Sequence, residues 1–256
     1  MILSYLYALI SGILSGGALG LTGGGGSILA VPLLVYLVGE NVHLAIGTSL
    51  IAVGVTSLIS SASYMKQSLV NFKIGLLMAA PGLVSTYLGA LLNKQVKGPV
   101  LLLAFALLMV YIGYLMAKKK SPEGKNKNND LNINYWRIII LGFITGLASG
   151  FFGVGGGFLL VPALYLGAKL KMKEAIGTSL FIIFLFGLFG LGSYIIQGRP
   201  INLLISSVFV VGGAIGGITG AYYAKRINQQ VLRRIFSYFI IAIGLAMFIQ
   251  NLIKII

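Results

Sequence analysis

The hydrophobic positions of this chain form long runs that are apolar on every side and are separated by short polar segments. Most runs are near the roughly 20 residues with which a helix crosses 30 Å of hydrocarbon. Because apolar and polar positions do not alternate within them, the runs do not predict the strands of a β-barrel. We expect membrane-spanning helices over about residues 3–21, 44–64, 74–92, 100–117, 138–152, 175–196, 203–224 and 235–253.

Two shorter apolar runs, Ile28–Val38 and Phe158–Ala168, have only about half the length of a membrane-spanning helix. Each lies between a cluster of glycines and a polar loop, which is the pattern of a broken or re-entrant half-helix. The expected fold is therefore all-α. It is a polytopic integral membrane protein with 8 to 10 transmembrane segments, two of which are half-helices.

One extended polar segment, residues 118–135, is rich in Lys and Asn and predicts a linker between a first membrane repeat (1–117) and a second (136–256). The two halves match in sequence, because AIGTSL at 45–50 recurs unbroken at 175–180. Such a match indicates a duplication. Before it, Gly12, Gly16, Gly20, Gly23, Gly25, Gly26 and Pro32 recur as Gly142, Gly146, Gly150, Gly153, Gly155, Gly156 and Pro162.

Composition supports a location in a bilayer, since 58% of the 256 residues are hydrophobic and 9% are charged. The formal net charge of +15 would favour a nucleic-acid partner in a soluble protein. Here the cations lie almost wholly between apolar runs, so we expect membrane lipid around the chain and no nucleic acid. The first residues, MILSYLYALI, place no basic residue before the apolar run, and no cleaved signal is expected.

The Lys and Arg residues also predict how the halves are oriented, because cytoplasmic loops collect cations. If each half crosses the membrane an odd number of times, most cations fall on one side, whereas an even number divides them almost equally. An odd number makes the second half inverted, with linker 118–135 in the cytoplasm and both termini outside. Inverted repeats with interrupted helices are typical of secondary transporters, whose site lies between the repeats near the midplane.

The glycine clusters are the first candidate for chemistry. Glycine frees backbone N–H groups, and a half-helix that starts there directs the positive end of its dipole inward, so an anion can be held without a charged side chain. Close helix packing is the alternative, and we prefer it for the small-xxx-small spacings elsewhere. Four successive glycines would cost a continuous helix several kcal/mol, which favours a site in the clusters. The candidate substrate-binding residues here are Thr22, Gly23, Gly24, Gly25, Gly26 and Ser27, with Gly153, Gly155, Gly156 and Gly157.

The sequence Gly-Thr-Ser occurs at 47–49 and again at 177–179. Its hydroxyl groups, on Thr48, Ser49, Thr178 and Ser179, can donate hydrogen bonds to an oxyanion. Such hydroxyls in membrane helices also bond to their own backbone, but their duplication beside the glycine clusters favours a role in binding. The duplicated Asn71 and Asn202 fall at loop edges, where helix capping explains them.

Other chemistry finds little support in the sequence. Cation transport is disfavoured because the acidic residues all lie in loops or at helix ends: Glu40, Glu123, Asp130 and Glu174. With no Cys and a single His, His43, we expect neither a metal site nor a cofactor. His43 is expected to be a solvated loop residue, and Arg199 could attract anions from the outer side. No catalytic set of side chains is recognisable, so the chain is not expected to be an enzyme.

Taken together, these motifs resemble one family. The segment GLTGGGGSILAVPLLVYLVG followed by AIGTSL, repeated as GFFGVGGGFLLVPALYLG followed by AIGTSL, resembles the sulfite exporter TauE/SafE family, also called the 4-toluene sulfonate uptake permease family. The resemblance covers nearly the whole chain outside the linker. It implies a multi-pass protein of the prokaryotic plasma membrane that moves sulfite, sulfoacetate or related organosulfonates. It also implies substrate contacts at the glycine clusters and Gly-Thr-Ser sequences, unequal in the two halves because Ser27 corresponds to Gly157 and Thr22 to Phe152.

The expected function is secondary transport, and more specifically export, of a small sulfur-containing anion, with the half-helices meeting near the bilayer centre and the halves rocking to alternate access. The membrane potential favours anion export by about 2.3 kcal/mol per charge per 100 mV, so no coupling ion is required. The alternatives are an uptake or proton-coupled permease for another small anion and a channel-like anion pore. A scaffold is hard to reconcile with duplicated half-helices. The small-residue faces are also compatible with a homo-oligomer.

Overall fold

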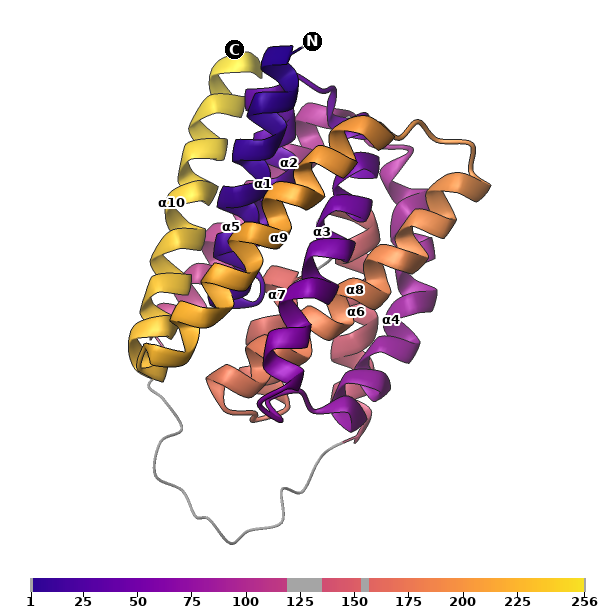
Figure 1. Ribbon diagram of the computed structural model, residues 1–256. Coiled ribbons are helices and arrows are strands. Elements are labelled where there is room, and N and C mark those ends of the chain that lie inside the picture. Colours follow the sequence, from indigo (N-terminus) through magenta and orange to yellow (C-terminus); the bar gives the residue numbers. More distant parts are fainter. Residues whose placement is uncertain (1, 119–134, 153–156, 256) are drawn as a thin grey trace, which may run out of the picture.

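The protein is an all-helical bundle in a computed structural model that describes residues 2–118, 135–152 and 157–255 (Figure 1). Its elements are α1 (Ile2–Thr22), α2 (Gly25–Leu33), the π-helix η1 (Leu34–Val38), α3 (Val42–Met65), α4 (Phe72–Asn93), α5 (Gly98–Lys118), α6 (Tyr135–Phe152), α7 (Gly157–Pro162), the π-helix η2 (Ala163–Gly167), α8 (Met172–Ile196), α9 (Leu203–Arg226) and α10 (Gln229–Ile255).

Within these ranges, eight helices are long and apolar enough to cross a membrane. The predicted all-α, polytopic fold is thereby confirmed. The two half-length segments are also present, and they begin slightly earlier than the hydrophobic pattern indicated. The first runs without a break from Gly25 to Val38, and the second starts at Gly157. Each ends in a π-helical turn that follows Pro32 or, in the second half, begins directly after Pro162.

The outer surface of the bundle is apolar. Large hydrophobic side chains such as Trp136 (75% exposed) and Ile196 (79% exposed) stand away from the protein. An aqueous surface of this composition would drive association, whereas a bilayer covers it with hydrocarbon. The exposure pattern is therefore that of a multi-pass membrane protein.

Both chain termini lie at one end of the bundle, and the end of α5 and the start of α6 lie at the other (Figure 1). In the first half, α1 leaves the terminal end, α2 and η1 return toward it, and α3, α4 and α5 then run alternately between the two ends. The second half passes between the ends in the same way, starting from the opposite end. The predicted linker lies between Lys118 and Tyr135, and its residues 119–134 are outside the described part of the chain.

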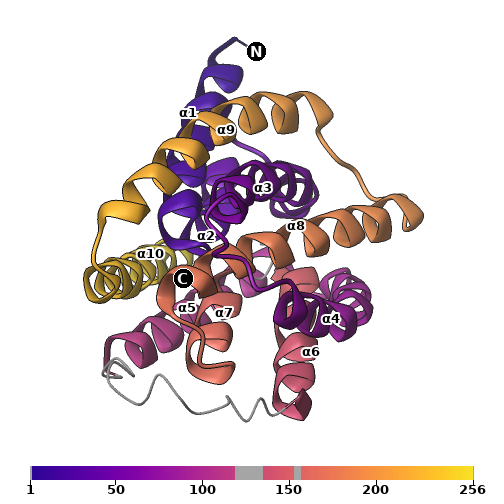
Figure 2. The ribbon, with the colours of Figure 1, turned by 60° about the horizontal axis from the view of Figure 1, so that its bottom comes forward.

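The two halves of the chain are interleaved. The most extensive helix contacts are those of α1 with α9 and of α6 with α4, and these pairs occupy corresponding positions in the duplicated sequence. The helices α3 and α8 cross in the middle, with α2 and α7 beside them (Figure 2). The helices α5 and α10 contact each other at the edge. The most extensive contacts between the halves thus occur in corresponding pairs.

Glycine allows these helices to approach at backbone distance. A Cβ atom on Gly16 would lie 2.2 Å from the carbonyl oxygen of Gly213, and one on Gly146 would lie 2.1 Å from the carbonyl oxygen of Gly82. Real Cβ atoms do not make such contacts, so no larger residue fits without separating the helices. The packing role predicted for the small-xxx-small spacings is confirmed.

Candidate substrate-binding site

The first glycine cluster forms a tight break between α1 and α2. Only Gly23 and Gly24 lie outside helices, and Gly23 has φ of +73°, a conformation that favours glycine. Gly25 already belongs to α2. The hydroxyl oxygen of Thr22 donates to the carbonyl of Ala18 (2.7 Å) and accepts the N–H of Gly25 (2.9 Å). Unwinding is therefore confined to two of the four glycines, and Thr22 satisfies the first N–H of α2.

The hairpin of α1 and α2 is closed by short contacts. A Cβ on Gly26 would lie 1.9 Å from the carbonyl oxygen of Ser15, and the Ser15 hydroxyl donates to the carbonyl of Gly26 (2.6 Å). The Ser27 hydroxyl donates to the carbonyl of Gly24 (2.7 Å). All of these groups are buried. The cluster thus serves close packing, and the binding of an anion by its backbone amides stays a prediction.

The half-helices of the two halves meet inside the bundle. Helix α2 contacts α7, and a Cβ on Gly157 would lie 2.7 Å from the Ser27 hydroxyl oxygen. Three other predicted site residues, Gly153, Gly155 and Gly156, lie outside the described residues. The structure therefore brings Ser27 of the first cluster to the last residue of the second.

The threonines of the two Gly-Thr-Ser sequences each bind a helix of the other half. The hydroxyl oxygen of Thr178 in α8 accepts the backbone N–H of Asn71 (2.9 Å), and that of Thr48 in α3 accepts the N–H of Asn202 (3.3 Å). Asn71 and Asn202 are the N-cap residues of α4 and α9, as expected from their loop-edge positions. Each threonine therefore fixes the start of a helix that belongs to the opposite half.

The serines and glycines of the two Gly-Thr-Ser sequences add further contacts around the place where the two halves meet, which we call the junction. The Ser179 hydroxyl donates to the carbonyl of Gly23 (2.9 Å) and shares its proton with Ile176 in its own helix (2.8 Å). The Ser49 hydroxyl donates to the carbonyl of Ile46 (2.8 Å). Gly47 lets the ring of Tyr194 approach, since a Cβ there would lie 3.1 Å from it. Every predicted hydroxyl thus has a protein partner in this arrangement, and donation to a substrate stays a prediction.

A stripe of hydroxyl groups on α3 was missed by sequence reasoning. Thr56, Ser57 and Ser60 are at most 1% exposed, and their hydroxyl groups have no hydrogen-bonding partner in the described residues. A Cβ on Gly213 would lie 2.3 Å from the Thr56 oxygen, and one on Gly217 would lie 2.2 Å from the Ser60 oxygen, so two members of the stripe face α9. Unsatisfied polar groups in a membrane interior are costly and mark places where a polar ligand or water can bind.

The signal for this stripe is an asymmetry between the halves. Positions 130 residues after Thr56, Ser57 and Ser60 hold Phe186, Gly187 and Gly190, which carry no hydroxyl. Thr48 and Thr178 were found because the same motif occurs in both halves, whereas the hydroxyl residues of the stripe occur in the first half only. A search for polar residues of one half that have no polar counterpart in the other would have found them.

A cationic network lies at the terminal end, close to the last turn of α6. The Arg199 guanidinium donates to the side-chain oxygen of Asn93 (2.6 Å) and lies 4.0 Å from the ring centre of Tyr194. The Asn93 amide in turn donates to the carbonyl of Phe151 (2.7 Å), two residues before Gly153. A ring nitrogen of His43 lies 3.3 Å from both Asn93 and Arg199. The expectation of a solvated loop histidine is wrong, because His43 is in the first turn of α3 and joins this network.

The Arg199 side chain binds the end of a helix and is also partly open to solvent. Its Nη1 donates to the carbonyl of Ala90 in the last turn of α4 (3.3 Å), so its charge complements the negative end of a helix dipole. It is also partly exposed, and its attraction of an anion that approaches this end of the bundle stays a prediction. Asn93, which connects Arg199 to Phe151, is fully buried and corresponds to Ala224 in the second half.

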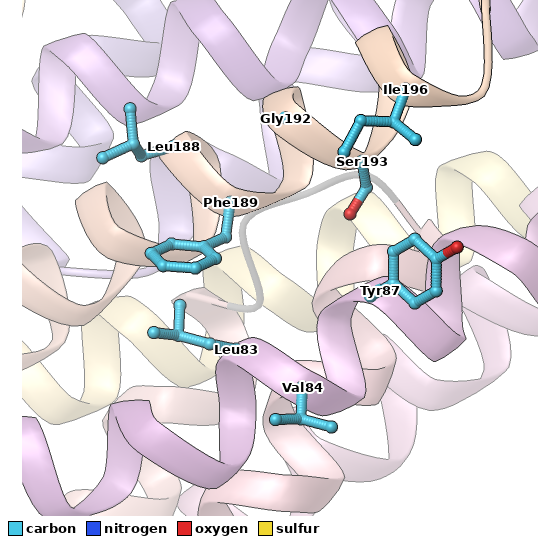
Figure 3. Close-up of a pocket in the computed structure, with 8 residues that line it drawn as sticks. All are labelled: Leu83, Val84, Tyr87, Leu188, Phe189, Gly192, Ser193 and Ile196. Atoms are coloured by element: carbon cyan, nitrogen blue, oxygen red, sulfur yellow. The ribbon is translucent and has the colours of Figure 1, made fainter.

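A separate groove of about 560 Å³ lies between α4 and α8 and faces outward (Figure 3). Its lining is apolar except for the Tyr87 and Ser193 hydroxyl groups, and Val84 and Leu188 are more than half exposed. Such a surface suits hydrocarbon and offers nothing to hold an anion. Within the part of the chain that the structure describes, no three His, Asp or Glu side chains gather where they could hold a metal ion.

Comparisons with known proteins agree with this architecture. The sequence model of the family described as "Sulfite exporter TauE/SafE" matches residues 8–247. A protein of Xylella fastidiosa (strain Temecula1), named a probable membrane transporter protein, is 37% identical over 246 residues, which are 94% of each chain. YunE of Bacillus subtilis, with the same description, is 29% identical over 94% of this chain and 96% of its own. MJ0441 of Methanocaldococcus jannaschii, also so described, is 30% identical over 82% of this chain and 81% of its own.

Proposed function

This chain belongs to the sulfite exporter TauE/SafE family of membrane transporters, and from that membership we propose that it exports a small sulfur-containing anion, such as sulfite or an organosulfonate. The observation that carries the proposal is the meeting of the two half-helices, where the Ser27 hydroxyl lies against Gly157. Two half-helices from opposite halves that converge inside a membrane bundle are the arrangement in which transporters hold substrate.

The binding chemistry that we propose uses neutral donors. Backbone amides at the starts of α2 and α7, together with the hydroxyl groups of Thr48, Ser49, Thr178 and Ser179, would surround a tetrahedral or pyramidal oxyanion. Hydrogen bonds from neutral groups hold an anion less tightly than a buried ion pair, which favours release on the far side. Gly153, Gly155 and Gly156 complete the proposed site from the second half.

We propose that the halves are inverted repeats that rock against each other. The corresponding contacts of α1 with α9 and of α6 with α4 support a two-fold relation between the halves, because halves related in this way make each inter-half contact twice. The opposite ends at which the two halves start support the inversion. The bonds of Thr178 to Asn71 and of Thr48 to Asn202 link the halves and would exchange partners as access alternates. An anion that reaches this junction would compete for the same hydroxyl groups.

The hydroxyl stripe of Thr56, Ser57 and Ser60 is proposed as the polar path that continues from Thr48 along α3. These residues follow Thr48 in the same helix, and their hydroxyl groups have no hydrogen-bonding partner within the described ranges. A partly dehydrated anion that passes them could receive hydrogen bonds in turn, which lowers the cost of leaving water.

For orientation, we propose the plasma membrane, with linker 118–135 in the cytoplasm and both termini outside. The bundle supports an odd number of passes in each half, and the cation distribution then selects the cytoplasmic side. With that orientation Arg199 lies at the outer end. Export of an anion from a negative-inside cell is favoured by about 2.3 kcal/mol per charge per 100 mV, so the potential alone can drive it.

The test is charge movement by purified protein in proteoliposomes on a solid-supported membrane. We would apply sulfite, sulfoacetate, taurine, sulfate, acetate and chloride in turn to the wild type, to Ser27→Ala, to the pair Thr48→Ala and Thr178→Ala, and to Ser207→Ala. Ser207 is a control because its exposed hydroxyl bonds only within α9. Currents selective for sulfite or sulfonates that fall in the first two variants and persist in the control support the proposal.

Two results would count against it. Currents that are equal for all six anions would indicate an unselective pore, and silence in folded wild-type protein would mean that the substrate is not a charged sulfur compound carried electrogenically. Flux of labelled sulfite at opposite voltages separates export from uptake, because a potential-driven exporter reverses with the sign of the voltage.

A further inference from the structure

Glu40 is a buried carboxyl group at the junction of the two halves. It follows Gly39, which ends η1 with φ of +87°, and precedes Asn41, the N-cap of α3. Its backbone N–H donates to the carbonyl of Leu34 (2.9 Å), and the residue is 8% exposed. The position 130 residues later holds Leu170, so the second half has no carboxyl group there.

The surroundings of this carboxyl group are polar but uncharged. The side chains of Thr48, in α3, and Asn202, the N-cap of α9, lie within reach of it and lower its pKa. Burial acts more strongly in the opposite direction and raises the pKa above its ordinary value. Neither carboxylate oxygen makes a hydrogen bond of good geometry in the described residues. A charged carboxylate here would be poorly compensated, and the neutral acid is favoured.

Charged and titratable groups on the neighbouring elements do not neutralise Glu40. They are Tyr36 on η1, His43 on α3, Arg199 before α9, and Lys97 before α5. Arg199 and His43 contact each other and Asn93, as described above. No ion pair with Glu40 is present among the described residues. The carboxyl group is thus a buried ionisable group without an ion-pair partner among the described residues, and the function proposed above makes no use of it.

We propose that Glu40 is a proton-binding site that gates the terminal end of the transporter, closing it when protonated and opening it when the proton leaves to solvent. The reason is the position of the group between η1, the Thr48 region of α3 and the start of α9. A neutral acid fits the buried position seen here, whereas a carboxylate requires water and would favour an arrangement that separates α9 from α3. This inference rests on the proposed anion transport and adds a proton to its cycle.

The decisive experiment compares three proteins that differ by one carboxyl group. Glu40→Gln removes the proposed site, and Glu174→Gln is the matched control, because Glu174 is a half-buried carboxylate in the first turn of α8 at the opposite end. Infrared difference spectra of reconstituted protein between acidic and neutral pH report a buried protonated carboxyl group directly. We expect its band in the wild type and in Glu174→Gln, and its loss in Glu40→Gln. A difference spectrum of Glu40→Gln that equals the wild-type spectrum overturns the proposal.

The second readout is the pH profile of sulfite-driven current from the same preparations. We expect a change of about threefold or more across the titration in the wild type and in Glu174→Gln, and less than about 1.5-fold in Glu40→Gln, since a single titrating group then no longer limits opening. Identical profiles in all three proteins overturn the gating role. If Glu40→Gln does not fold, the experiment uses Glu40→Leu instead. Leucine is the residue at the corresponding position 170.

Failure of this proposal and failure of the proposed function are distinguishable. A wild-type protein that shows the Glu40 band but carries no sulfite current contradicts the proposed substrate while supporting proton binding at Glu40. A sulfite current with the same pH profile in Glu40→Gln supports the transport function and contradicts the gate.

Discussion

The hydroxyl group of Ser179 in α8 donates a hydrogen bond of 2.9 Å to the backbone carbonyl of Gly23, which directly follows α1 in the other half of the chain. The neighbouring Thr178 likewise binds Asn71 of the first half. A motif that the sequence presents as a local Gly-Thr-Ser triplet is therefore a connection between halves. Any motion of one half against the other must break or shift these bonds, which places the candidate site at the moving junction.

Removing the Ser179 hydroxyl should destabilise this junction. Ser179→Ala leaves the Gly23 carbonyl without that donor, and we expect a loss of about 0.5–2 kcal/mol, because hydrogen bonds inside membranes are worth about 0.6 kcal/mol on average and orphaned buried acceptors cost more. Thermal unfolding in detergent measures the effect. Ser207→Ala removes an exposed hydroxyl that bonds within its own helix and should leave the unfolding temperature unchanged. Equal shifts in both variants would mean that the bond to Gly23 adds nothing to stability.

Packing of the α1–α2 hairpin makes Gly26 intolerant of substitution. In Gly26→Ala the new Cβ would lie 1.9 Å from the Ser15 carbonyl oxygen, which is backbone and cannot move aside. We expect the free energy of unfolding to fall by about 3 kcal/mol or more, the upper end of the range typical of overpacked cores. The yield of monodisperse protein and the unfolding temperature should both fall strongly. The control is Gly192→Ala, because no atom lies within 4 Å of its Cβ position. A folded, stable Gly26→Ala protein would contradict the described hairpin.

Asn93 joins a helix end to the cationic network and should be sensitive to truncation. Asn93→Ala leaves the Phe151 carbonyl without a donor and removes the oxygen that accepts from Arg199 at 2.6 Å. We expect about 2–4 kcal/mol of destabilisation, since a buried acceptor and a charged donor both lose their partner. Asn228→Ala, which removes only a local bond to the N–H of Gln230, should cost about 1 kcal/mol or less. Chemical-denaturation midpoints in micelles compare the two.

The sequence predicts those parts of this fold that depend on local pattern. Apolar runs predict the eight long helices, Asn71 and Asn202 mark helix starts, and spaced glycines such as Gly16 predict close packing. Each of these follows from a residue and its neighbours in the chain. The half-helices are also predicted by local pattern, because each apolar run that follows a glycine cluster is too short for a complete membrane-spanning helix.

The partners of polar side chains could not be predicted in the same way. Which half Ser179 contacts, and whether Glu40 is buried, depend on how the halves interleave, and the periodicity of either half contains no information on that. Asn93 directly follows the apolar run 74–92, and the corresponding residue, Ala224, is not polar. Its network with His43 and Arg199 therefore had no signal in the duplication. Tertiary context decides these cases.

The Glu40 carboxyl group predicts a specific dependence of stability on pH. Its pKa is raised by burial, so between the ordinary value and the raised one the folded protein binds more protons than the unfolded chain. Stability contributed by the neutral acid is present at low pH and is lost as pH rises through that window. The unfolding temperature of Glu40→Gln relative to the wild type should therefore increase from acidic to neutral pH. A difference that stays constant or falls with pH would contradict the raised pKa.

The hydroxyl stripe on α3 predicts that stability and transport change in opposite directions. Thr56→Val keeps the shape of the side chain and removes a hydroxyl that has no partner in the described residues, and Ser60→Ala does the same at the next turn. We expect each substitution to raise the free energy of unfolding by about 1 kcal/mol or more, because a buried unsatisfied polar group is removed. The unfolding temperature should rise accordingly. If the stripe is the path of the anion, the same variants should lower sulfite-driven current several-fold.

The matched control for this prediction is Ser61→Ala, because Ser61 is equally buried in the same helix and its hydroxyl already donates to the carbonyl of Leu58. That variant should gain no stability and leave the current near the wild-type value. A protein evolved for stability alone would have no reason to keep Thr56 and Ser60, since the corresponding positions of α8 hold Phe186 and Gly190. Variants that are both more stable and fully active would show that the stripe carries no substrate.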